Sequence, residues 1–378
     1  MIKRISLKTK WNIKGDAVFS MLVIALAIYG TVIVISSGME YAAIRYGDSL
    51  YFAKKHIVWL VLGFATMIIS STVDIEKYKR LTPVMYGATL VLLILVLAVG
   101  FVGNGAKRWI SIGLITIQPS EFSKLSLIMI LSLYFSKNES KIADTRSRGS
   151  IFKYGTLYPA LIMLSIIIPV MLQKHLSCII ILGLIGLSTI FLSGTNTKYI
   201  RYFCVIAVIC VVCLALFTDY TKDRIMVWLD PEKYKLTGGW QTLQGLMAIG
   251  SGGIFGVGLG NSVLKHCYVS EPANDMVFTI LCEELGFIGA AAALTLFVLL
   301  IVRGYHISLK LKDTYARLLG LGISTKMAIQ VLLNIAVVTN TIPNTGISLP
   351  FFSYGGSSLL MLFFEMGIML ALSRKVNL

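Results

Sequence analysis

Apolar runs long enough to cross a lipid bilayer recur along this chain, and they constrain its fold more than any other feature. A helix needs about 20 apolar residues to span the hydrocarbon layer. Hydrophobic residues make up 56% of the 378 residues and charged residues only 14%, with a mean hydropathy of +0.81. We therefore predict an all-α polytopic membrane protein that forms a single integral membrane domain over residues 1–378. The ten predicted spans are Ala17–Ser37, Ile57–Thr72, Leu81–Phe101, Glu121–Phe135, Thr156–Leu172, Leu176–Leu192, Tyr199–Thr218, Asp275–Val302, Leu318–Thr341 and Gly355–Leu372.

Basic residues indicate how the spans are oriented. Cytoplasmic loops of membrane proteins carry an excess of Lys and Arg. If the spans alternate from a cytoplasmic N-terminus, the inner segments hold nearly twice as many of the 34 Lys and Arg residues as the outer segments. Topology thus explains the net charge of +16, and we expect no nucleic-acid partner. Both termini are expected in the cytoplasm, with the first span retained because it is longer than a signal-peptide core.

One connection, residues 219–274 on the outer face, is far longer than the others. Loops of that length are functional or disordered. Its residues Trp240, Leu243, Leu246 and Met247 recur at helical spacing, so we expect a short amphipathic helix on the membrane surface. A glycine-rich stretch over residues 250–260 follows. Its glycines either let backbone pack closely against a span or leave N–H groups free for an anion, and both alternatives stand.

Charged side chains lie at the outer ends of several spans. Lys107, Arg108 and Trp109 form a cationic, aromatic cluster, while Glu121 and Lys124, three residues apart, can pair on one helix face. The segment 334–370 contains helix-breaking prolines and glycines, and such backbone is tolerated at membrane depth only beside protein or a cavity. We expect these segments to line one outward-facing cavity.

Four acids accompany the eighth span, where each buried carboxylate is costly. Glu271 and Asp275 lie at its mouth, and Glu283 and Glu284 lie within it. We expect one of the two deeper glutamates to pair inside the bundle and neither to be catalytic.

Three long motifs resemble the SEDS family (shape, elongation, division and sporulation), which includes RodA, FtsW and SpoVE. They are GAKRWISIGLITIQPSEFSKL, QTLQGLMAIGSGGIFGVGLGNS with YVSEPANDMVFTILCEELGFIG, and TGISLPFFSYGGSSLLMLFFEMGI. The resemblance covers nearly the whole chain in order. The ending EMGIMLALSR is more similar to the FtsW/SpoVE branch than to RodA.

The resemblance implies a peptidoglycan glycosyltransferase in the bacterial cytoplasmic membrane. It would polymerise lipid II, with undecaprenyl pyrophosphate as the leaving group. A class B penicillin-binding protein would supply the transpeptidase, beside other proteins of division or elongation. Asp275 matches the family's catalytic aspartate and is the candidate general base. Glu121 and Lys124 match a pair linked to activation. The candidate substrate-binding residues are Lys107, Arg108, Lys265, Glu271, Ser353 and Tyr354.

Two departures from the family pattern bear on these roles. Ala273 stands where His is usual, just before Asp275, so a contact from that His is lost. His175 stands where many relatives have an acid, so the role of that acid does not transfer. A divalent cation, Mg²⁺ or Mn²⁺, is a candidate cofactor, although the four histidines show no metal-ligand spacing.

Two other classes of function remain open. A lipid II flippase would also be a polytopic protein with internal charges and broken helices, although we detect no internal repeat of the kind that many transporters contain. A non-catalytic division scaffold would need no acid at position 275. For a partner helix, the small residues Gly286, Gly289 and Ala290–Ala293 predict a docking surface on the eighth span.

Overall fold

The computed structural model describes residues 15–103, 106–112, 115–143, 152–195, 201, 219–236, 238–265 and 272–376. Within them, seven helical segments are long and apolar enough to cross a membrane, which confirms an all-α polytopic membrane protein. These are α1 (Ala17–Tyr46), α2 (Tyr51–Thr72), α3 (Ile75–Val99), the π-turn η1 (Lys153–Leu157) with α6 (Tyr158–Leu172), α11 (Val277–Leu309), α12 (Thr314–Val338) and α13 (Gly356–Val376). The other described helices are α4 (Pro119–Ala143), α7 (Leu176–Leu192), α9 (Asp219–Leu229) and α10 (Gly239–Ser251).

Every predicted span except Tyr199–Thr218 coincides with one of these helices. That span lies, apart from Arg201, outside the described residues. Several helices extend beyond the apolar run, as α11 does to Leu309, because a helix continues into its polar ends while the run marks only the apolar part.

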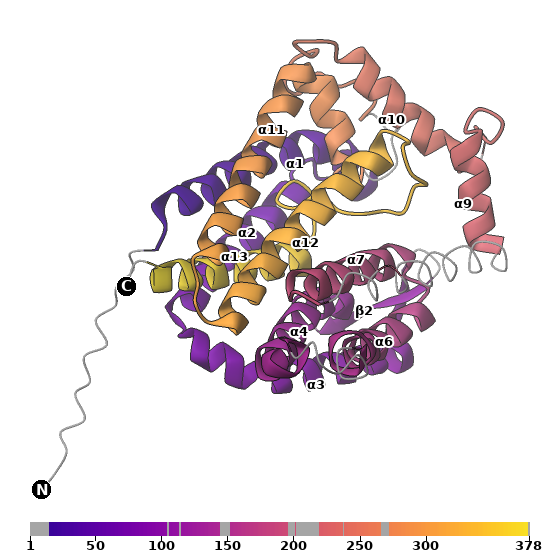
Figure 1. Cartoon of the computed structure of the whole chain (residues 1–378). Coiled ribbons are helices and arrows are strands. Elements are labelled where there is room, and N and C mark those ends of the chain that lie inside the picture. Colours follow the sequence, from indigo (N-terminus) through magenta and orange to yellow (C-terminus); the bar gives the residue numbers. More distant parts are fainter. Residues whose placement is uncertain are drawn as a thin grey trace, which may run out of the picture.

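The helices pack in two groups around α12 and α13 (Figure 1). One group contains α1, α2 and α11; the other contains α3, α4, α6 and α7, with α4 and α7 against α12. Of the membrane-length helices, α13 and α12 are the most buried, whereas α2 and α3 expose most of their apolar surface. The core therefore lies along α4, α12 and α13, and the outer helices present apolar faces of the kind a bilayer solvates.

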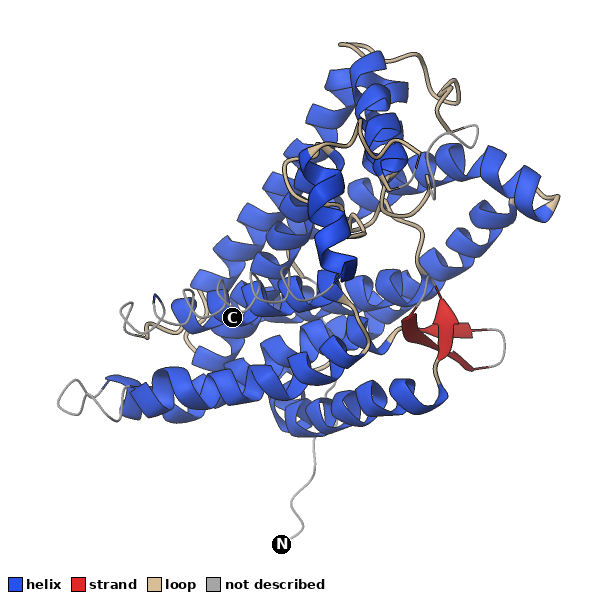
Figure 2. Cartoon of the chain, turned by 90° about the vertical axis from the view of Figure 1, so that its right-hand side faces the viewer, coloured by secondary structure: helices blue, strands red, loops and turns tan. Residues whose placement is uncertain are grey.

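The segment after α3 folds into a small antiparallel sheet, which we did not predict. Its strands are β1 (Phe101–Gly103), β2 (Ala106–Ile112) and β3 (Ile115–Ile117), in the order β1-β2-β3. β3 consists of the β-branched residues Ile-Thr-Ile, and β2 contains Trp109, Ile110 and Ile112, as strand propensity favours. The sheet lies at one edge of the helical body (Figure 2).

A break in α11 at Gly286 explains the glycine-rich stretch before it. Gly286 has φ 64° and ψ −162°, which frees the carbonyls of the preceding turn. The loop supplies donors: the N–H of Val257 donates to Glu283 O (3.0 Å) and that of Gly258 to Glu284 O (2.9 Å). A Cβ at Gly252 would lie 1.9 Å from the carbonyl oxygen of Cys282. Close backbone packing is thus the alternative that the structure supports.

α10 confirms the predicted helix, but it runs alongside α11. Gly245 faces Thr279 and Gly252 faces Cys282, so the contacts advance in the same direction along both helices. The small residues of α10 face α11, while Trp240 and Met247 are exposed. The helix is amphipathic, as expected, and its position at the membrane surface stays a prediction.

Much of the predicted partner surface on α11 is covered by the chain itself, although Ala292 is exposed. Gly289, Ala290 and Ala293 are buried within the chain's own bundle. The hydroxyl of Tyr29 on α1 donates to the carbonyl of Gly289 at 2.9 Å. The small residues permit close approach, as expected, but the helix that approaches is α1.

Candidate functional site

A cavity of about 850 Å³ lies where the polar segments converge. It is bounded by β2, the first turns of α4, α7 and α13, the turn before α11, α9, the start of α10, and the loop between α12 and α13. Residues from all three motif regions share this one cavity, as the sequence predicted. The charged and imidazole side chains in its wall are Arg108, Glu121, Lys124, His175, Asp223, Arg224 and Asp275.

Two helices, α7 and α11, begin beside this cavity. At the other end of the bundle, aspartate side chains cap α1, α3 and α12: for example, Asp313 accepts from Ala316 N at 2.9 Å. At the cavity end, α7 and α11 have no side-chain cap. Uncapped N-termini carry partial positive charge and bind anions. The cavity is therefore suited to an anionic ligand.

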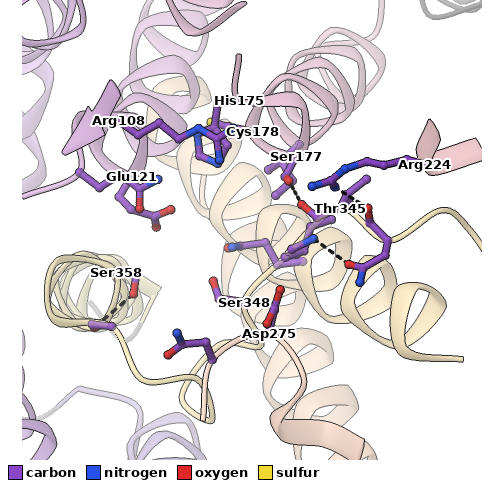
Figure 3. A pocket seen from close by; sticks show the side chains of 18 of the residues that line it. Arg108, Glu121, His175, Ser177, Cys178, Arg224, Asp275, Thr345, Ser348 and Ser358 are labelled. Atoms are coloured by element: carbon purple, nitrogen blue, oxygen red, sulfur yellow. Dashed lines mark hydrogen bonds between the residues drawn. The ribbon is translucent and has the colours of Figure 1, made fainter. Parts of the chain in front are cut away.

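Asp275 lies in the turn before α11, on one side of the cavity (Figure 3). The side-chain amide of Asn334 on α12 holds this turn by donating to Asp275 O (3.0 Å) and to Ile347 O (2.6 Å). The N–H of Tyr354 donates to Ala273 O at 2.8 Å. The carboxylate is half-buried, and its backbone is fixed from both α12 and the loop that follows it.

Ala273 is buried, and its methyl side chain cannot donate a hydrogen bond to Asp275. The aromatic wall beside it is formed by Tyr354, whose ring packs edge-on against Phe52 with centroids 4.9 Å apart. Burial raises the pKa of Tyr354 to about 12, so it remains a neutral phenol at the cavity wall.

Arg108 and Glu121 lie across the cavity from Asp275 (Figure 3). Lys124 Nζ and Glu121 Oε1 are 2.7 Å apart, and little of either side chain is exposed. Arg108 is anchored by its donation to the carbonyl of Lys174 at 2.5 Å, in the turn before α7. The site thus opposes a carboxylate to cations across a space that a ligand can fill.

Arg224 on α9 is a cavity cation that the sequence analysis counted only as a topology marker. Its guanidinium donates to the carbonyl of Asn344, which ties α9 to the loop between α12 and α13. Trp228, one turn further, donates to Asn340 O at 3.0 Å. Arg224 and Trp228 are four residues apart on one helix face, and that spacing was the available signal.

Three predicted substrate-binding residues that the structure describes do not line this cavity, and a fourth is not described. Lys107 alternates with Arg108 on β2 and is exposed. Ser353 is buried and accepts from Leu349 N at 2.7 Å. Lys265 is buried beside Glu284, with Nζ 3.0 Å from Oε1. Glu271 lies outside the described residues.

The two deep glutamates have structural partners. Glu284 pairs with Lys265 and accepts from Ser36 at 2.7 Å. Glu283 accepts from the backbone of Val263 at 2.9 Å and from the Ser262 hydroxyl at 2.5 Å. One glutamate pairs inside the bundle, as expected, and both are used in holding the glycine-rich stretch to α11.

The described residues contain no group of three or more metal-ligating side chains. The cavity acids Glu121, Asp223 and Asp275 come from separate elements. They fit Mg²⁺ only in the mode in which one carboxylate and the phosphates of a substrate hold the ion together.

His175, in the turn between α6 and α7, yields a prediction about pH. Burial, reinforced by the positive charge of Arg108, lowers the pKa of His175 to about 3, against about 6.5 in an unfolded chain. Between those values only the unfolded chain binds the proton, so the wild type loses stability as pH falls. His175→Gln removes this effect. From pH 7.5 to 5.5 the variant should gain about 1 kcal/mol relative to wild type, measured by thermal unfolding in detergent. An unchanged difference would show that His175 has the same pKa in the folded and the unfolded chain, which would contradict the lowered pKa.

The fold and the site define a multi-pass membrane protein with a charged cavity that carries a carboxylate at one end of its bundle. Known proteins share this architecture. Residues 16–378 match the FtsW/RodA/SpoVE family of cell cycle proteins. Stage V sporulation protein E of Bacillus subtilis is 36% identical over 95% of this chain and 97% of its own length. The probable peptidoglycan glycosyltransferase FtsW of Geobacter sulfurreducens is 32% identical over 96% of each chain.

Solved structures agree. A chain from a peptidoglycan synthase complex that coordinates polymerization and crosslinking has a TM-score of 0.79 and 26% identity, covering 96% of this chain and 98% of that one. The rod shape determining protein RodA of Thermus thermophilus has a TM-score of 0.70 and 25% identity, covering 97% and 98%. This chain belongs to the FtsW/RodA/SpoVE family.

Proposed function

We propose that this protein is a peptidoglycan glycosyltransferase that polymerises lipid II at the outer face of the bacterial cytoplasmic membrane. One observation carries the proposal: Asp275 faces Arg108, Lys124 and Arg224 across a single cavity at which uncapped helix N-termini meet. The FtsW relatives, which match over nearly their whole length, carry the name peptidoglycan glycosyltransferase.

Asp275 is the general base in this proposal. A sugar hydroxyl is a weak nucleophile at neutral pH, so the attacking 4-hydroxyl of the acceptor needs a positioned group to take its proton. The hydroxyl oxygen attacks the anomeric carbon of the donor sugar, its proton passes to the Asp275 carboxylate, and the bond to the diphosphate breaks. A half-buried carboxylate on a turn fixed by Asn334 is suited to that step.

The leaving diphosphate is stabilised by the opposite wall. Arg108 and Arg224 offer rigid guanidinium donors, which match phosphate oxygens. The N-terminus of α7, which has no side-chain cap, adds N–H groups on the same wall. Preorganised positive charge at the position where negative charge develops is commonly a large part of catalysis.

A divalent cation fits the same arrangement. One of the other cavity carboxylates, Glu121 or Asp223, would hold Mg²⁺ or Mn²⁺ together with the diphosphate, and the ion would supply charge neutralisation. The protein residues would still bind and orient both sugars.

A class B penicillin-binding protein is the proposed partner, and other division or elongation proteins would join it. This proposal is supported by the likeness to a chain of a peptidoglycan synthase complex. Because most of the small residues of α11 are buried, the partner helix would have to contact an outward apolar face, such as that of Val298 and Val302.

The direct test is incubation of the purified protein with labelled lipid II, with and without the partner and with and without a chelator. We expect glycan ladders that increase with the partner and decrease when the divalent cation is removed. Translocation of lipid II across vesicles without any ladder would favour a flippase. Neither activity, with normal partner binding, would favour a scaffold.

A further inference from the structure

A second buried ion pair lies behind the Glu121–Lys124 pair. Lys326 on α12 places its ammonium 2.7 and 2.6 Å from the two carboxylate oxygens of Glu365 on α13. The side chain of Glu365 is fully buried and that of Lys326 is 4% exposed. Neither residue lines the large cavity, so the proposed mechanism does not use them directly.

A small cavity joins the two pairs. Its volume of about 20 Å³ is enough for about one water molecule. Glu121 and Lys326 both line it, together with the polar residues Gln330 and Ser358, which line the large cavity as well. A water there has the two to four polar partners that a buried water needs.

The four side chains alternate in charge from the bundle core to the large cavity. Glu365 is paired with Lys326, Lys326 shares the small cavity with Glu121, and Glu121 is paired with Lys124, which lines the large cavity. The positive charge of Lys326 therefore adjoins Glu121 from the side opposite to Lys124.

We propose that Lys326 and Glu365 are positioning residues. With one water in the small cavity they fix the Glu121 carboxylate, and Glu121 in turn holds the Lys124 ammonium at the wall where the substrate diphosphate binds. This role rests on the proposed function.

Stability alone is a poor explanation for such a pair. Replacing a buried ion pair by apolar residues of similar volume is often neutral or stabilising, because desolvation offsets the attraction. Burying these two charged residues costs free energy, so a role in orienting Glu121 explains their presence better than a role in stability does.

The test uses the double variant Lys326→Met/Glu365→Met in the full-length protein with its partner. We expect an unchanged or higher melting temperature but at least about a tenfold lower kcat on lipid II, with KM changed far less. In a Glu121→Gln background the same double change should lower kcat by less than about twofold. The carboxylate that Lys326 and Glu365 are proposed to position is already absent there. If the Met pair does not fold, Lys326→Gln/Glu365→Gln replaces it.

The exchange Lys326→Glu/Glu365→Lys separates orientation from a simple link between α12 and α13. It keeps the link but places a carboxylate beside Glu121, so kcat should stay low. The matched control is Asp16→Asn/Arg303→Met, which removes a partly buried ion pair (2.5 Å) at the N-terminus of α1, at the other end of the bundle, and retains a helix cap. It should polymerise like wild type.

A double-mutant cycle on melting temperatures tests the coupling between Glu121 and the Lys326–Glu365 pair without measuring polymerisation. The change in melting temperature caused by Glu121→Gln should differ by about 3 °C or more between the wild-type and Met-pair backgrounds. Full kcat in the Met pair or in the exchange, or equal thermal shifts in both backgrounds, would overturn the positioning role. Wild-type protein without polymerisation would instead refute the proposed function, while the thermal cycle would still report on the network.

Discussion

The Asp275→Asn variant is expected to lose about 10²–10⁴-fold in lipid II polymerisation, the usual contribution of a general base. Asn is nearly isosteric and keeps hydrogen-bonding capacity, but it cannot accept the acceptor's proton. The backbone contacts from Asn334 to this turn do not involve the carboxylate, so folding should be retained. Lipid II binding should also largely persist, because the lost interaction acts in the transition state.

The measurement is glycan-chain formation by wild type and variant, normalised to folded protein. Asp223→Asn is the matched control: Asp223 contributes a second carboxylate to the same cavity, from α9. Its loss should be less than about tenfold, because proton abstraction requires hydrogen-bond reach of one hydroxyl. Full polymerisation by Asp275→Asn would refute the base assignment.

Reversing one charge of the Glu121–Lys124 pair should produce the second large effect. Glu121→Lys or Lys124→Glu leaves like charges at a buried site, and breaking a buried pair costs about 3–5 kcal/mol. We expect either single reversal to lose most polymerisation and much stability. The double reversal should recover part of both, because attraction between the two positions is restored.

Recovery should stop short of wild type, because a Lys at position 121 would face Lys326 across the small cavity. The matched control is reversal of Asp48 and Lys54, an exposed pair 2.8 Å apart, which should change stability by less than about 1 kcal/mol. Purely additive losses for the Glu121–Lys124 reversals would show that the pair does not act as a unit.

The helices were largely predictable because their determinants are local. An apolar run of membrane length has few alternatives to a helix, and Pro119 begins α4, where its fixed φ suits the first turn. The sheet over residues 101–117 was missed because its short strands of three to seven residues give little periodic signal beside long apolar runs.

The candidate site was predictable in part. Arg108, Glu121, Lys124, Asp275 and Tyr354 share one cavity, as expected from polar segments at span ends. Lys265 illustrates the limit: its sequence position near Asp275 favoured a ligand contact, yet its ammonium is neutralised by Glu284, nineteen positions away. Which acid a cation meets depends on how the glycine-rich stretch folds back on α11.

The sequence by itself determined the membrane class, the helices and the family, because apolar runs and motifs act within short windows of chain. Only the tertiary structure decided what each helix faces. Gly289 meets α1 inside the bundle, Arg224 joins the cavity through α9, and Lys326 meets Glu365 between α12 and α13. These contacts depend on how each helix is rotated about its axis and how deeply it packs. Side chains that are far apart in the sequence determine both.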